Sequence, residues 1–156
     1  MNGMTSQIEV QKSITCKYLA YKYRQDSDFV YLRLPMVHVY IRCGDREITT
    51  DGLVDSGSTA TFLPFEFVEV LELIDLKESS AVGAGGSFPT WLGKVDMLKV
   101  MKRREPFDTF RNIKVHIPKT EGAIPYVVLG RDSIFRHFDI TFYENRKKIT
   151  FTRYKL

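Results

Sequence analysis

The stretch Leu53-Val54-Asp55-Ser56-Gly57-Ser58-Thr59-Ala60 decides how the rest of this chain is interpreted. Two apolar residues lead into an acid, a Ser-Gly-Ser turn follows, and apolar residues return at Phe62-Leu63. Asp is poor in strands and is rarely buried in its ionised form without a partner. Gly57 permits a backbone turn where a Cβ would clash. Two interpretations are equally open at this point: a carboxylate held at the floor of a cleft, or an ordinary strand-end turn.

The composition predicts one soluble, globular domain that is rich in β-structure. With 156 residues, of which 44% are hydrophobic and 27% charged, the chain can bury a core of its own. The aromatic content of 13% favours strands. The net charge of +4 is modest and indicates a solvated basic surface rather than a particular partner. No apolar run reaches the ~18 residues that a membrane helix needs, so no membrane partner is expected.

Cysteines and histidines give no sign of a metal or cofactor site. The three histidines are widely separated, and Cys16 and Cys43 are far apart, so no metal-ligand spacing stands out. Whether the two cysteines pair is open. No secretory apolar region precedes them, and we therefore expect a cytoplasmic protein with no cofactor.

The first third of the chain predicts strands that lead to the acid. Residues 1–12 are expected to be a flexible leader, and 13–23 a strand with an irregularity. A turn at 24–28 and a second extended run at 29–34 follow, ended by Pro35. Strict alternation over 37–43 and a return over 46–54 make a hairpin that leads directly to Asp55.

The remaining elements alternate between short helices and strands. Pro64 to Leu73 is the best helix, with Phe67, Val68, Leu71 and Ile74 on one face. Asp132 is expected to cap a short helix over 133–137. Further strands are expected at 91–100, 113–117 and 126–130, with a basic loop at 101–106, a connection at 119–125, and a final hairpin pairing Ile140 and Phe142 with Ile149 and Phe151.

Three features in this order resemble the retropepsin-like aspartic proteases, the single-motif relatives of pepsin that include the retroviral enzymes. They are the Asp55-Ser56-Gly57 signature, the glycine-rich segment 82–86, and the run Val127-Val128-Leu129-Gly130-Arg131-Asp132. The resemblance covers roughly residues 37–151. It implies a mostly β, single-lobe acid-protease barrel with one or two short helices, formed as one domain by residues 13–156.

The resemblance also implies roles for individual residues. Asp55 would be the catalytic acid of an aspartic endopeptidase that hydrolyses extended, largely apolar peptides. Ser58 would donate a hydrogen bond to Asp55 and lower its pKa. The active-site loop would consist of Ser56, Gly57 and Ser58, the substrate-binding flap of Val82, Gly83, Ala84, Gly85 and Gly86, and the structural support of Leu129, Gly130, Arg131 and Asp132.

This chain differs from the viral pattern just after the motif, and it carries the motif only once. Viral enzymes carry an acid shortly after the motif that pairs with the arginine corresponding to Arg131, but this chain has Thr59 and Ala60 there. The partner of Arg131 is therefore open. Only one Asp-Ser-Gly motif is present, so the resemblance implies a homodimer in which a second copy supplies the other carboxylate.

Several alternatives remain beside the protease hypothesis. A non-catalytic peptide-binding or dimerisation module with the same fold is the main one. A serine-hydrolase triad lacks its Gly-x-Ser-x-Gly elbow. The basic runs 102–104 and 146–148 are better interpreted as solvated turns than as a nucleic-acid surface. Trp91 could line the cleft, but strand aromatics are more often core residues.

Overall fold

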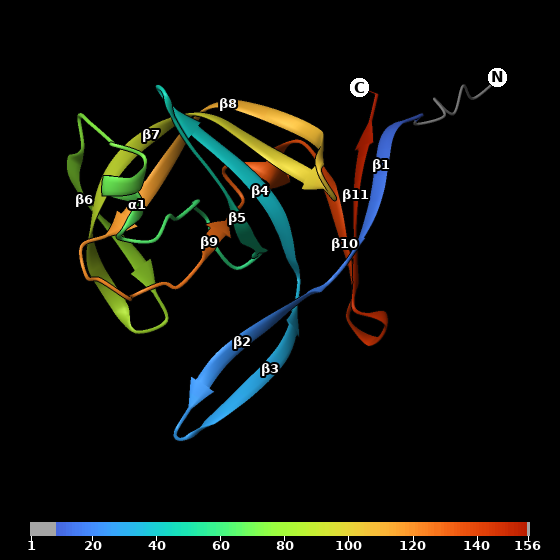
Figure 1. Ribbon diagram of the computed structural model, residues 1–156. Coiled ribbons are helices and arrows are strands. Elements are labelled where there is room, and N and C mark those ends of the chain that lie inside the picture. The colour runs from blue at the N-terminus through green and yellow to red at the C-terminus, as the bar shows by residue number, and fades with distance from the viewer. Residues whose placement is uncertain (1–8, 156) are drawn as a thin grey trace.

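The computed structural model describes residues 9–155 and shows a mostly β protein (Figure 1). Of the expected leader 1–12, residues 1–8 lie outside this range. Strand β1 begins at Val10, so residues 10–12 belong to a sheet, because they pair with the C-terminal strand β11. No described helix is both long and apolar enough to cross a bilayer.

The strands form three sheets within the described residues. One sheet has the order β1-β11-β10, the second is the β2–β3 hairpin, and the third has the order β6-β7-β4-β5-β9 with β8 paired to β7. The strands are β1 Val10–Lys17, β2 Leu19–Gln25, β3 Asp28–Leu34, β4 Met36–Cys43, β5 Arg46–Val54, β6 Lys77–Gly83, β7 Gly86–Lys102, β8 Glu105–Pro118, β9 Val127–Leu129, β10 Asp139–Tyr143 and β11 Lys148–Tyr154. The helices are α1 Phe67–Val70 and the 3-10 turns η1 Ile134–Arg136 and η2 Glu144–Arg146.

The predicted hairpin that leads to the acid is confirmed as β4 and β5. Val37, Val39 and Ile41 are buried on one face of β4, while the alternate residue His38 is exposed. Beside β5 runs the parallel strand β9, in the register Val54↔Leu129. All three residues of β9 are buried, as expected for a strand covered on both faces.

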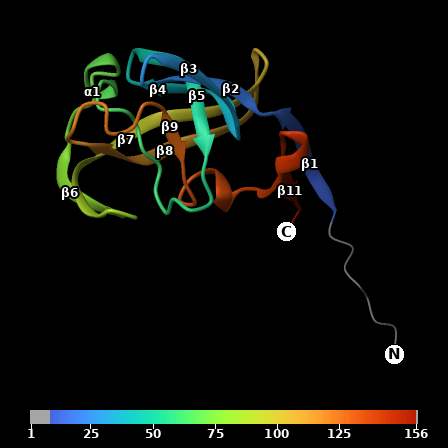
Figure 2. The same ribbon diagram turned by 90° about the horizontal axis from the view of Figure 1, so that it is seen from below.

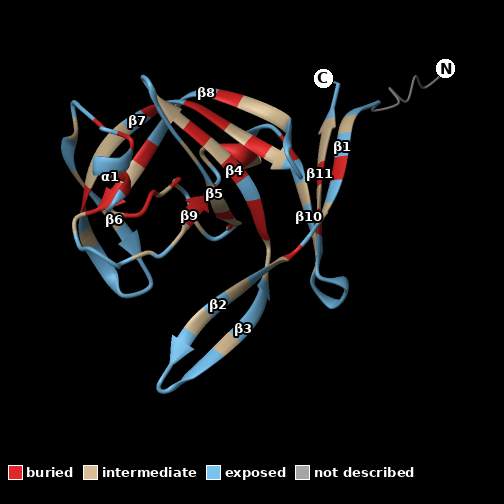
Figure 3. Cartoon of the chain, in the orientation of Figure 1, coloured by how far each residue is buried: buried red, intermediate tan, exposed pale blue. Residues whose placement is uncertain are grey.

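The core lies between the large sheet and the elements that fold over it. Figure 3 shows buried residues along β4, β7, β8 and β9, whereas the β2–β3 hairpin and the tip of the β6–β7 hairpin are more exposed. Fully buried side chains of the core include Val39, Ile41, Leu63, Leu71, Val95, Leu98, Ile117, Leu129, Ile134, Ile149 and Phe151.

The two ends of the described chain meet in the three-stranded sheet. The predicted pairing of Ile140 with Phe151 and of Phe142 with Ile149 is confirmed. The predicted irregularity within 13–23 is also present, because buried Tyr18 separates β1 from β2. Strands β2 and β3 extend further than expected, so the turn shrinks from 24–28 to Asp26-Ser27. This hairpin projects from the body of the protein (Figure 1).

The predicted helix from Pro64 to Leu73 is wrong in length, because α1 has only four residues. Glu72 has a φ of +49° and ends the helix in a Schellman motif. In that motif the Leu73 amide donates to the Val68 carbonyl (2.9 Å) and the Glu72 amide donates to the Glu69 carbonyl (3.1 Å). The reversal returns Leu73 to the core and leaves Ile74, expected on the buried face, 75% exposed.

The predicted basic loop at 101–106 is also wrong. Strand β7 continues to Lys102, β8 begins at Glu105, and only Arg103-Arg104 remain as the turn, with Arg103 at a φ of +58°. The β7–β8 ribbon accommodates these polar residues because the end that carries the turn is exposed to solvent. Both strands are therefore longer than the apolar runs 91–100 and 113–117 that predicted them.

Candidate active site

Asp55 directly follows β5 and is held by backbone groups on three sides. Its amide donates to the Leu129 carbonyl (3.1 Å), and its carbonyl accepts from the Ser58 amide (3.2 Å). The Gly57 amide donates to Asp55 Oδ1 at 2.8 Å. Asp55 itself is half-buried, whereas Ser56 and Gly57 are exposed. The loop that carries them lies beside β9 (Figure 2), so a fixed carboxylate is presented at the surface.

The predicted support residues do lie against this loop. The amides of Arg131 and Asp132 donate to the carbonyls of Ser58 (2.9 Å) and Thr59 (3.2 Å). A Cβ on Gly130 would lie 2.0 Å from the Ala60 carbonyl oxygen, so only glycine allows this approach. Within residues 9–155 no ion pair involves Arg131, whose bond to the loop is made by its backbone.

A buried polar network around Thr61 completes the brace. Thr61 Oγ1 lies 2.9 Å from Asp132 Oδ1 and 2.7 Å from Ser133 Oγ, and both Thr61 and Ser133 are fully buried. Ser133 also donates to the Gly130 carbonyl at 3.1 Å. The prediction that Asp132 caps a helix is wrong, because its carboxylate accepts from Thr61 and the N-cap of η1 is Ser133. Thr61 was missed, and its only signal was a hydroxyl residue beside an apolar run.

The role predicted for Ser58 is also wrong. Its hydroxyl donates to the Ala60 carbonyl at 2.6 Å instead of to Asp55. Within the described part of the chain, the hydrogen-bond donor to the Asp55 carboxylate is the Gly57 amide. The side chain of Ser58 therefore shapes the turn, and the expected hydrogen bond from Ser58 to the Asp55 carboxylate is not formed.

Aromatic side chains that the sequence did not single out lie on the segments next to the Asp55 loop. Phe62 pairs with Val128 through two backbone hydrogen bonds of 2.9 Å, and its ring lies 6.2 Å from the ring of Phe88 on β7. Burial raises the pKa of Tyr126, and Tyr21 and the negative charge of Asp55 raise it further. Tyr126 is therefore a neutral phenol close to the acid.

The glycine-rich segment forms the tip of the β6–β7 hairpin. Gly83 pairs with Gly86 around a two-residue turn at Ala84-Gly85. All five residues predicted for this tip are exposed, and Val82 is 84% exposed. The space around Gly85 and Gly86 is open, with no atom within 4 Å of a Cβ built on either.

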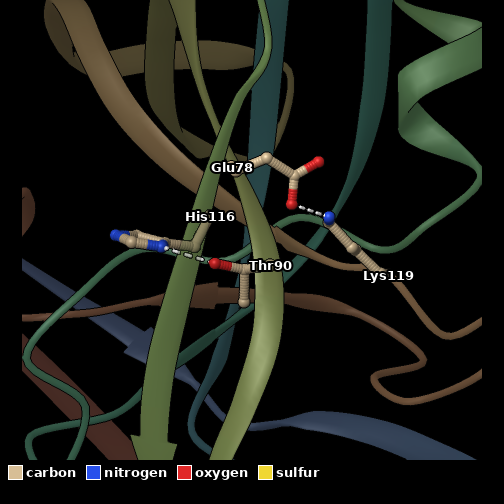
Figure 4. Close-up of polar contacts among 4 residues, drawn as sticks. All are labelled: Glu78, Thr90, His116 and Lys119. Carbon is tan, nitrogen blue, oxygen red and sulfur yellow. Dashed lines mark hydrogen bonds and ion pairs between the residues drawn. The ribbon is translucent and has the colours of Figure 1, made fainter.

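The base of the same hairpin is anchored by polar contacts (Figure 4). Glu78 on β6 forms an ion pair with Lys119, and Thr90 Oγ1 on β7 lies 3.2 Å from His116 Nδ1. The backbone of His116 bonds both to the Thr61 carbonyl (2.9 Å) and to the Leu63 amide (3.0 Å). His116 thus connects the hairpin base to the segment that follows the Asp55 loop. Nothing in the sequence distinguishes His116 from the other two histidines.

The electrostatics of His116 follow from its position. Burial lowers its pKa below the ordinary histidine value, with Lys114 acting in the same direction and Asp132 opposing them.

Trp91 is half-buried with its ring 5.8 Å from that of Phe65, and it packs against the core. This packing agrees with the interpretation of Trp91 as a core residue.

No metal-binding cluster is found among residues 9–155, and both cysteines are free thiols. The largest cavity described, about 940 Å³, lies at the opposite end of the large sheet, between the β4–β5 turn and the start of β6. Its lining includes Cys43, Arg46, Glu72 and Lys94 but not Asp55. Next to the Asp55 carboxylate lie the Gly57 amide, which donates to it, and the Tyr126 phenol.

Comparison with known proteins places the fold. No family model matches the sequence, and no curated protein matches it. A crystal structure of a retropepsin-like aspartic protease from Rickettsia conorii superposes with a TM-score of 0.58 at 15% identity, covering 96% of each chain. EIAV protease in complex with the inhibitor HBY-793 superposes with a TM-score of 0.51 at 18% identity, covering 73% of this chain and 93% of that one. This mostly β chain therefore has the retropepsin-like fold.

Proposed function

We propose that this chain is an aspartic endopeptidase that acts as a homodimer on extended, largely apolar peptide segments. The observation that carries the proposal is the Asp55 carboxylate, which is half-buried directly after β5 and fixed there by the Gly57 amide. Its place in a retropepsin-like fold supports the same chemistry, since both structures compared above are described as proteases.

The proposed chemistry needs a second copy of the chain. Ionising two carboxylates in contact costs electrostatic free energy, so the pair keeps one shared proton. The protonated carboxyl group then serves as the acid and the ionised one as the base. Only one Asp-Ser-Gly motif is present, so the second Asp55 would come across a two-fold axis. The exposed Ser56 is available to hydrogen-bond across that axis and to lock the two loops together.

The reaction would proceed without a covalent enzyme intermediate. One Asp55 carboxylate takes a proton from a water held between the pair, the water oxygen bonds to the peptide carbonyl carbon, and the other Asp55 donates its proton to the carbonyl oxygen. The resulting gem-diol then breaks its C–N bond. The amine nitrogen takes a proton from one carboxyl group while a diol hydroxyl returns a proton to the other. The pair ends with a single proton, as it began.

The surroundings of Asp55 support a preference for apolar substrates. Tyr126 lies close to Asp55 and Phe62 follows the Asp55 loop, and both rings are half-buried, so they offer partly apolar surface beside the loop. The exposed tip of the β6–β7 hairpin would act as a flap, with its backbone amides and carbonyls binding the main chain of the peptide. No residue of this arrangement requires a metal or cofactor. A cytoplasmic location stays a prediction.

A non-catalytic peptide-binding or dimerisation module is the second candidate. The pairing of β1 with β11 within one chain favours the peptide-binding form of this module over a dimer, because these two strands need no second copy to complete their sheet. Under this hypothesis Asp55 would be a remnant of the fold.

Cleavage of an unfolded protein at mildly acidic pH tests the proposal, with the wild type compared with Asp55→Asn. We expect the substitution to reduce the cleavage rate by at least about 100- to 10,000-fold, because it removes both the acid and the base. Specific activity should also fall on dilution, as dimers dissociate. If the wild type is as inactive as Asp55→Asn at every pH and concentration, and pepstatin-type ligands fail to bind, the module hypothesis is correct.

A further inference from the structure

A hollow of about 370 Å³ lies between the β2–β3 hairpin and the body of the protein. Tyr21 of β2 and Tyr126 both line it, and Tyr126 directly precedes β9, whose Leu129 carbonyl accepts from the Asp55 amide, so the hollow adjoins the candidate active site. The other lining residues are Met36, His38, Thr49, Thr50, Asp51 and Pro125. A peptide that passes Asp55 and Tyr126 can therefore reach this hollow.

One side of the hollow is apolar and aromatic. The rings of Tyr21 and Tyr126 meet edge to face at 5.2 Å, and Tyr21 also stacks on Tyr23 at 6.3 Å. Within the described residues, the β2–β3 hairpin pairs with no further strand. The contact between the two tyrosines therefore helps to hold the hairpin against the body, since an isolated two-stranded ribbon is only marginally stable.

The other side of the hollow carries a negative charge. Asp51 Oδ1 lies 2.6 Å from His38 Nδ1, and the Asp51 side chain is 44% exposed. That contact uses one carboxylate oxygen and leaves the second open to a ligand. Neither lysine nor arginine lines the hollow, so no side chain there carries a permanent positive charge. This local charge contrasts with the net charge of +4 of the whole chain.

We propose that this hollow is a substrate subsite for a long basic side chain, lysine or arginine, at a position of the peptide away from the scissile bond. The aliphatic stem would pack on Met36, Pro125 and the tyrosine rings, and the cationic head would reach Asp51. A tyrosine ring face also attracts a cation. An apolar side chain would fill the same volume but leave the open oxygen of Asp51 without a partner. The inference rests on the proposed function, because it assumes that a peptide lies over Asp55.

Peptide binding to the Asp55→Asn protein tests the subsite without turnover. A fixed apolar peptide is used in which one lysine is moved through every position, and each lysine peptide is compared with its norleucine counterpart. We expect one position at which lysine binds about tenfold more tightly, the sum of a half-exposed ion pair and a cation–π contact. Adding Asp51→Asn should bring that ratio close to one.

Two further variants separate the subsite from general effects. Asp26→Asn removes the same charge at the exposed turn of the β2–β3 hairpin, outside the hollow lining, and should leave the lysine preference intact. Tyr21→Ala should weaken the binding of both the lysine peptide and the norleucine peptide when these residues stand at the preferred position.

Three results would overturn the inference. In the first, peptides bind without a lysine preference, or the preference survives Asp51→Asn, and the proposed protease function is untouched. In the second, Tyr21→Ala changes the monomer–dimer equilibrium and not peptide affinity, which would make the hairpin a subunit contact. In the third, no peptide binds at all, and the proposed function fails together with the subsite.

Discussion

The loop that holds Asp55 and the tip of the β6–β7 hairpin both depend on glycine, but for opposite reasons. We call the first region the floor, defined as residues 55–61 together with 130–133. In the floor, Gly130 leaves no room for a Cβ, which would lie 2.0 Å from the Ala60 carbonyl oxygen. At the tip, Gly85 and Gly86 have open space around them. Glycine thus permits close packing in one region and backbone access in the other.

The difference separates stability from function. Bonds from buried partners hold the floor in place, among them those from Thr61 and Ser133. The tip is exposed and bonded only through its own hairpin ladder. Changes in the floor should therefore alter folding and activity together, whereas changes at the tip should alter activity with little effect on folding.

The largest expected effect is that of Gly130→Ala. The added methyl group meets backbone atoms that cannot move without opening the floor, so we expect the free energy of unfolding to fall by about 3 kcal/mol. Denaturant unfolding followed by fluorescence measures this. The matched control is Gly85→Ala, which has open space and a φ outside the left-handed region. It should raise stability slightly, by up to about 1 kcal/mol. Equal effects of the two substitutions would remove the distinction between floor and tip.

How far the sequence predicted these two regions depends on what holds each one. Asp55, the glycine tip and the run from Leu129 to Asp132 are local patterns, so they could be found and placed in order. Thr61, Tyr126 and His116 matter only through contacts with residues distant in the sequence. Their hydroxyl, phenol and imidazole groups carry no signal in the sequence, because each finds its partner only in the folded chain.

The errors in the prediction have the same cause. The helix predicted to reach Leu73 ends at Val70 because Glu72 adopts a left-handed conformation that no local rule favours for glutamate. Ser58 was assigned to the Asp55 carboxylate because it is near in sequence, yet its hydroxyl bonds to the Ala60 carbonyl. Local propensity identified the turn but not the partner that each side chain would find.

A smaller effect is expected for Gly86→Val at the tip. Gly86 has a φ of +106°, which a β-branched residue avoids, so the variant should distort the hairpin end and stiffen it. Because the tip is exposed and can relax, we expect a loss of stability of about 1 kcal/mol, at the low end for a residue held at a disfavoured φ. If the tip closes over substrate, kcat/KM should fall by about tenfold. A variant with full activity would show that the tip does not take part in binding.

The smallest effect concerns His116, which lies where the floor and the hairpin base meet. Burial lowers its pKa in the folded state, so the unfolded chain binds a proton more readily. The stability that this neutral histidine contributes is therefore complete above the unfolded pKa of about 6.5 and is lost as pH falls towards the folded value. His116→Gln keeps a polar partner for Thr90 but does not titrate.

Unfolding free energies at neutral and mildly acidic pH measure this contribution. On acidification, the free energy of unfolding should fall more for the wild type than for His116→Gln. The difference between these two free energies should therefore become smaller as the pH falls below about 6.5. Parallel pH profiles would show that His116 is not the source of the acid sensitivity. Because the proposed cleavage assay is run at mildly acidic pH, a wild-type loss in that range would loosen this junction under the assay conditions. The floor and the tip of the β6–β7 hairpin would then be coupled through the His116 imidazole. Substitutions in the two regions would have separate effects on folding and activity only at neutral pH.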